Sequence, residues 1–280
     1  MKRPVSSIVN IPKLQPHGGF IPPKEMTVEL LDDNPSDNYE RLVDMSCKMG
    51  SLRPQSLGLV FDYLLRTEIA LMAGADIAEA IFNAFKVSFM GADLAHKYDE
   101  AEELALKLAE LYQKKRRDRK KIAQVASELV VFDAVFRAGY YNPDAETPKV
   151  SDGDKNALDL MLGATECYLL EKQQLTSLGF GFTAIGAENV APSDGDLLTK
   201  DSLIDLKCSV NEPTSKHTLQ LLLYYILGLH EQPNAFKPLK YVKILNPRLG
   251  RVYSYEIAKV DIEDLKHIER EIMGYKKSVF

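Results

Sequence analysis

Apolar residues follow two kinds of spacing along the chain. In the first half they recur three and four positions apart, which is typical of helices with one buried face. Helices are therefore expected over 54–74, over 76–89 and, in a longer stretch, over 98–138. Each shows a single apolar stripe, so these helices are expected to pack into a core.

The longest of these stretches contains a basic run at 113–121, where the apolar period continues across nine polar residues. Either one helix runs through this segment or two helices meet there. Clustered Lys and Arg occur both on solvated helix surfaces and on patches that bind nucleic acid, and both interpretations stay open. On the second interpretation, Lys115, Arg116 and Arg119 would contact a phosphate backbone.

The second half alternates helical periods with short apolar stretches, which indicates an α/β class in which helices flank a mixed sheet. The expected helices span about 154–174, 218–230 and 261–275, and the expected strands lie at 179–188, around Asp196, and at 203–208, 240–245 and 251–257.

Composition and the positions of proline and glycine suggest three regions. Residues 1–38 are rich in Pro, Gly and Asp without a sustained period, and predict an extended N-terminal arm. A helical region is expected over 39–140. Proline and glycine gather again at 140–153, which makes this loop the expected start of an α/β core over 141–280.

Net charge and cysteine content bear on the expected partners and on the expected cellular location. The net charge of −5 argues against nonspecific coating of nucleic acid, although basic residues can still act locally. Three scattered cysteines predict no disulfide framework and favour a cytoplasmic location. The N-terminal residues lack the apolar segment of a signal peptide, and no apolar run reaches the ~20 residues of a membrane span.

The candidate chemistry lies in the second half. Asp205 and Lys207 stand two apart in an expected strand, so their side chains project to the same face. Asp196 ends the preceding strand and returns to the same place if residues 200–202 turn the chain into a hairpin. Two carboxylates and an ammonium would then converge, an arrangement that suits a hard divalent cation and a phosphate substrate.

The helix that follows carries Gln220 and Tyr224 four apart on one face. With these residues the second half resembles the PD-(D/E)xK nuclease superfamily, in particular its RecB-like and lambda-exonuclease-like branches. The matching pattern is an acid, a hairpin, D-x-K, and a helix with Q-x-x-x-Y, here Asp196, Asp205, Lys207, Gln220 and Tyr224. Glu166 stands in the Gly-x-x-Glu context that the branch has in its preceding helix. The chain departs from the pattern at Gly195, where a proline is common, and Asp194 is an alternative first acid.

The resemblance implies a restriction-endonuclease-like core, Mg²⁺ or Mn²⁺ as cofactor, and hydrolysis of phosphodiester bonds, most of all in DNA. It implies Asp196, Asp205 and the carbonyl of Leu206 as metal ligands, with Glu166 a possible further one and Glu171 its rival. Lys207 would orient and activate the attacking water. The resemblance also points to Gln220 and Tyr224 as residues beside the substrate. Lys216 and His217, just before the helix, are weaker candidates for a phosphate contact, and a solvated helix start is the stronger interpretation of both.

Other functions stay open on the sequence. The chain could be an inactive nuclease-fold module that binds nucleic acid or a protein. The helical region could dock a protein partner or a second copy. Endonuclease or exonuclease action, and DNA or RNA as substrate, are equally undecided.

Overall fold

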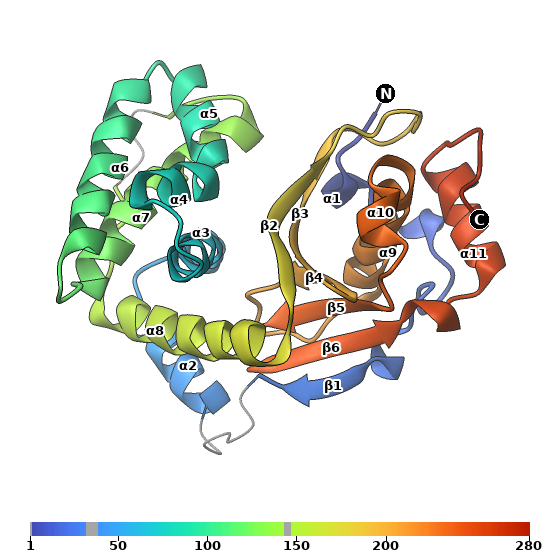
Figure 1. Cartoon of the computed structure of the whole chain (residues 1–280), viewed down its shortest axis with the longest axis horizontal. Coiled ribbons are helices and arrows are strands. Elements are labelled where there is room, and N and C mark those ends of the chain that lie inside the picture. The colour runs from blue at the N-terminus through green and yellow to red at the C-terminus, as the bar shows by residue number, and fades with distance from the viewer. Residues whose placement is uncertain (1, 32–38, 143–146) are drawn as a thin grey trace. The chain divides into compact units, whose positions relative to one another are not determined.

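The computed structural model describes residues 2–31, 39–142 and 147–280, except the side chains of residues 171 and 172, and divides them into two compact units (Figure 1). The sheet unit comprises Met1–Leu31, Tyr168–Asn246 and Arg251–Phe280, and the helical unit comprises Asp32–Cys167 and Pro247–Gly250, in each case as far as they are described. The helical unit is thus inserted in sequence between two parts of the sheet unit.

An open six-stranded sheet forms the centre of the sheet unit, which confirms the α/β class with a mixed sheet. Its strands are β1 (Thr27–Leu30), β2 (Leu175–Phe182), β3 (Ser193–Thr199), β4 (Ser202–Leu206), β5 (Tyr241–Asn246) and β6 (Arg251–Glu256). The spatial order is β1-β6-β5-β4-β3-β2. Strands β4 and β5 pair in parallel, and the other neighbouring pairs are antiparallel.

The parallel pair requires a crossover connection, and helix α9 (Ser215–Glu231) supplies it. This helix is apolar on most sides because it is buried in the core that also contains Leu203, Val242 and Ile244 of the sheet. The twisted sheet curves around α9 (Figure 1). The remaining helices of this unit are short: α1 (Val5–Ile8), α10 (Pro233–Phe236) and α11 (Ile262–His267), the last continued by a π-helical turn at Ile268–Ile272.

The helical unit consists of helices packed on one another. They are α2 (Tyr39–Lys48), α3 (Pro54–Met72), α4 (Ile77–Ala84), α5 (Lys86–Leu94), α6 (Tyr98–Gln113), α7 (Arg119–Ala138) and α8 (Asp152–Cys167). The stripes found in the sequence are buried, with Phe61, Leu64, Leu108 and Leu129 in the core. No helix in the described part of the chain is long and apolar enough to cross a membrane.

The basic run is a junction between two helices. Helix α6 ends at Gln113, and α7 begins after Asp118, whose carboxylate accepts a hydrogen bond from the backbone N–H of Lys121 at 3.2 Å. Asp118 is a favourable N-cap residue because it satisfies one of the unpaired N–H groups at the helix start. Of the two interpretations of this segment, two helices that meet is the one observed.

The units divide the chain differently from the regions expected at 1–38, 39–140 and 141–280. Helix α8 belongs to the helical unit, because its buried side packs against α2 and α3. The expected arm contributes β1, which pairs with β6 far along the chain; residues 1 and 32–38 of that region lie outside the described residues. The strand expected at 179–188 is β2, which starts earlier and ends at Phe182.

Candidate metal-dependent site

Two acids lie opposite each other on neighbouring strands. In the antiparallel pair of β3 and β4, Leu197 is opposite Ile204 and Leu198 is opposite Leu203. The same register puts Asp196 opposite Asp205. Side chains that are directly opposite in an antiparallel ladder lie on one face about 5 Å apart at Cβ. The hairpin therefore brings the two carboxyl groups together on the face that α9 covers.

Hydrogen bonds hold both acids in place. The backbone N–H of Leu206 donates to Oδ2 of Asp196 at 2.7 Å. Asp205 is only 2% exposed, and its Oδ2 lies 2.5 Å from Nζ of Lys207. The same ammonium is 3.4 Å from the carbonyl oxygen of Leu206. Lys207 thus contacts two of the atoms that the resemblance implies as metal ligands, which shows that this cluster accommodates a positive charge.

Helix α9 contributes Gln220 and Tyr224 on the face of the sheet that it covers. The amide of Gln220 donates to the hydroxyl of Tyr224 at 2.9 Å, as the four-residue spacing allows. Burial raises the pKa of Tyr224 far above its usual value, and the negative charges of Asp205 and Asp196 raise it further, while the hydrogen bond from Gln220 opposes them. Tyr224 therefore lies within the field of both acids.

Asn246, at the end of β5, fixes the loop that follows Lys207. It is 1% exposed, accepts from the N–H of Ser209 at 3.3 Å and donates to the carbonyl of Ser209 at 2.8 Å. The N–H of Lys207 also donates to Leu245 at 2.9 Å. The sequence did not indicate this role. The only available signal was a polar residue at the end of a strand parallel to β4.

Gly195 lies directly opposite an aromatic ring. A Cβ atom at this position would lie 2.3 Å from the ring of Phe180, its register partner on β2. A side chain at this position, proline included, would require the ring of Phe180 to shift. Asp194, the alternative first acid, is exposed and pairs with Gly181, whereas Asp196 is the acid opposite Asp205.

Glu166, the predicted further ligand, is on α8 and belongs to the helical unit. Burial and its hydrogen bond with Glu68 raise the pKa of Glu166 to about 8, against the influence of Arg119. Glu68 is buried, accepts from the hydroxyl of Tyr112 at 3.0 Å and forms an ion pair with Arg119. A metal role for Glu166 stays a prediction. The side chain of its rival, Glu171, lies outside the described residues.

Of the side chains predicted to contact nucleic acid, some are exposed to solvent and others are bound to groups of the protein. Lys115 and Arg116 are exposed between α6 and α7. The guanidinium of Arg119 is instead bound to Glu68. Lys216 is exposed and donates to the side chain of Asn10 at 2.9 Å. Lys115 and Arg116 are therefore better placed than Arg119 to contact a phosphate backbone.

The donor set in the sheet unit fits a magnesium-like ion. Residues 2–31, 39–142 and 147–280 contain no group of three or more His, Cys, Asp or Glu side chains that could hold a metal. Mg²⁺ is commonly bound by one or two carboxylates with water and substrate phosphate at its other positions. The two acids and the neighbouring carbonyl of Leu206 are oxygen donors of the kind that such an ion takes.

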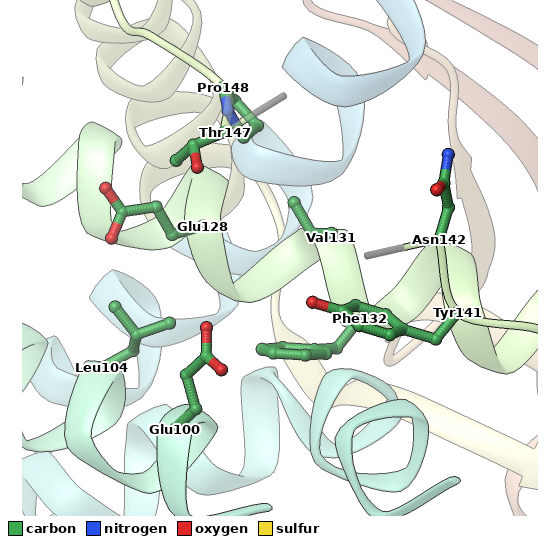
Figure 2. A pocket seen from close by; sticks show the side chains of 9 residues that line it. All are labelled: Glu100, Leu104, Glu128, Val131, Phe132, Tyr141, Asn142, Thr147 and Pro148. Carbon is green, nitrogen blue, oxygen red and sulfur yellow. The ribbon is translucent and has the colours of Figure 1, made fainter. Parts of the chain in front are cut away.

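A cavity of about 240 Å³ lies apart from these residues, within the helical unit (Figure 2). Tyr141 stacks on Phe132 at one side, with 6.4 Å between the ring centroids. Its lining consists of Glu100, Leu104, Glu128, Val131, Phe132, Tyr141, Asn142, Thr147 and Pro148. None of the residues predicted for catalysis, metal or nucleic acid lines this cavity.

Comparison with protein-family models, with curated proteins and with solved structures found no match. A functional assignment therefore depends on the residues and their geometry.

Proposed function

We propose that the chain is a Mg²⁺- or Mn²⁺-dependent nuclease that hydrolyses phosphodiester bonds, with DNA the favoured substrate, and that its sheet unit is a restriction-endonuclease-like core. The observation that carries the proposal is the position of Asp196 opposite Asp205 with Lys207 on the same face. Such a cluster combines oxygen ligands for a cation with a second positive charge for the substrate.

Asp196, Asp205 and the carbonyl of Leu206 would hold the ion. When bound, the metal supplies Lewis-acid polarisation of the phosphate and lowers the pKa of a water. The burial of Asp205 favours binding, because a carboxylate away from bulk water gains more from a nearby cation. Glu166 as a further ligand stays a prediction.

Lys207 would orient the attacking water and stabilise negative charge as it develops on the phosphate. Its side chain is 25% exposed, so the ammonium can move from Asp205 toward a substrate. Gln220 uses one amide N–H for Tyr224, and its second N–H is available for the substrate. Tyr224 would pack beside that contact.

Calorimetric titration with Mn²⁺ tests the proposal most directly. We expect binding by the wild-type chain, loss of binding in Asp196→Asn and Asp205→Asn, and retention in Asp194→Asn. Labelled duplex DNA incubated with Mn²⁺ should be cut only by the proteins that bind the ion. If the wild-type chain neither binds Mn²⁺ nor cuts DNA, the nuclease proposal is wrong.

The competing function is a binding module with this fold and no hydrolysis. It is favoured by the described residues, which include no group of three or more His, Cys, Asp or Glu side chains that could hold a metal ion. Binding of DNA without any Mn²⁺ binding in the same titration would support it.

A further inference from the structure

Helix α9 starts with an unusual capping residue. The backbone N–H of Thr214, the N-cap residue, donates to Nδ1 of His217 at 3.0 Å, which is one half of a capping box. The third residue of a capping box is usually Glu or Gln. In those residues a side-chain oxygen accepts the hydrogen bond from the backbone N–H of the N-cap residue, and there is no ring. Histidine does the same with one ring nitrogen and keeps a second nitrogen for another partner.

The cap determines which nitrogen carries the proton. Because Nδ1 of His217 accepts a hydrogen bond, the proton of the neutral ring is on Nε2. Burial lowers the pKa of His217 to about 4, and the charges of Lys207 and Lys216 contribute in the same direction. The ring is therefore neutral at physiological pH and presents Nε2–H as a fixed donor.

The position of His217 on the helix directs it to the candidate site. His217, Gln220 and Tyr224 are separated by three and four residues, so they lie on one face of α9. Tyr224 is in the field of Asp205, and the charge of Lys207 acts on His217. The histidine is thus the N-terminal member of a row whose other end lies in the field of the two acids.

We propose that His217 donates its Nε2–H to a non-bridging oxygen of the phosphate that Lys207 faces. The inference rests on the proposed function and adds a substrate-contacting residue to it. A neutral donor suits this place because a second full positive charge would repel the ammonium of Lys207. Lys207 then supplies charge, and His217 fixes the direction of one phosphate oxygen.

Three substitutions separate this contact from the role in the cap. His217→Gln keeps an oxygen for the backbone of Thr214 and an N–H for phosphate. His217→Glu keeps the oxygen and offers no donor. His217→Ala removes both without adding charge. We expect kcat/KM for DNA cleavage to fall about 10- to 100-fold in the Glu and Ala variants, as for a lost hydrogen bond to a charged group, and less than about fivefold in the Gln variant.

Stability and binding measurements complete the test. The Gln and Glu variants should unfold at the wild-type temperature, since both residues are favourable in a capping box. Cleavage by His217→Ala at the wild-type rate, measured well below its unfolding temperature, would overturn the inference. So would equal losses in the Gln and Ala variants.

The inference can fail separately from the proposed function. If the wild-type chain does not cut DNA at all, affinity for a labelled oligonucleotide in Ca²⁺ replaces the rate. The Ala and Glu variants should then bind about 10-fold more weakly than the Gln variant. Equal affinities of all four proteins would show that His217 only caps the helix.

Discussion

Both compact units contain two carboxyl groups beside a basic side chain, and the two arrangements differ in how negative charge is neutralised. In the helical unit, Glu166 is hydrogen-bonded to Glu68, and its pKa of about 8 keeps it protonated at neutral pH. In the sheet unit, Asp196 accepts from a backbone N–H, and Asp205 is paired with a lysine. In the helical pair the pKa of one acid is raised, mainly by burial, whereas the sheet pair faces a cation.

The basic side chains that pair with these acids, Arg119 and Lys207, also differ. Arg119 presents a rigid, planar guanidinium to Glu68, an acid that also accepts from Tyr112. Lys207 ends in a compact ammonium on a flexible chain, which under the proposed function would leave Asp205 when a metal ion binds. Two acids and a base are therefore not sufficient to indicate catalysis. The partners must also be able to exchange for substrate and metal.

The largest effect is expected for Lys207→Ala. Cleavage of DNA should fall about 1,000-fold, because a charge that stabilises the transition state is lost. The circular dichroism spectrum should stay that of the folded chain. Lys200→Ala is the matched control, since Lys200 is exposed at the turn of the same hairpin. Cleavage at the wild-type rate by Lys207→Ala would remove the lysine from the mechanism.

A smaller loss is expected for Tyr224→Phe. The substitution removes the hydroxyl that accepts from Gln220 and leaves the amide less firmly oriented. We expect kcat to fall about 10-fold, in line with the loss of one hydrogen bond. Tyr225→Phe, on the next position of the same helix, should cleave normally. Equal rates for the two variants would contradict a role for the Gln220–Tyr224 pair.

The basic junction of the helical unit should affect affinity and leave catalysis unchanged. In the double variant Lys115→Ala/Arg116→Ala, the slope of log affinity against log salt should decrease by about 1 to 2, one for each lost phosphate contact. Fluorescence anisotropy over a range of salt concentrations measures this slope. An unchanged slope would leave the junction as a solvated surface.

Glu166→Gln should have the smallest effect on cleavage and should instead change the pH dependence of stability. The folded chain keeps a proton that the unfolded chain releases above the ordinary pKa of 4.5, so stability is fully present below that pH and decreases until about pH 8. Denaturant unfolding at pH 5 and pH 8 should show this decrease in the wild type and a smaller one in the variant. A loss of cleavage as large as that of Lys207→Ala would place Glu166 among the metal ligands.

The sequence predicted local relations well. A period of two puts Asp205 and Lys207 on one face, and a spacing of four brings Gln220 to Tyr224; both relations depend only on regular backbone geometry. A period cannot specify contacts between segments that are distant along the chain. The pairing of β1 with β6 and the ring of Phe180 over Gly195 are of that second kind.

The sequence pattern also cannot show which charged side chains are paired with distant groups. The seven basic residues at 113–121 look equivalent in the sequence, but only the structure shows that Arg119 is bound to a buried glutamate. Likewise, Asn246 precedes a proline in the sequence, and nothing in the sequence indicates which groups it would bind. Its hydrogen bonds to Ser209 depend on a parallel neighbour contributed from across α9.

The insertion of the helical unit within the sheet unit has a consequence for synthesis. Strand β1 is at the edge of the sheet and is synthesised early, but its partner β6 is synthesised only after the intervening helices and strands. Residues of the intervening helices emerge first, and their local contacts form quickly compared with strand pairing over long separations. A nascent chain would therefore have folded helices before Asp196, Asp205, Lys207 and α9 are brought together. Under the proposed function, the helical unit would fold before the candidate site exists.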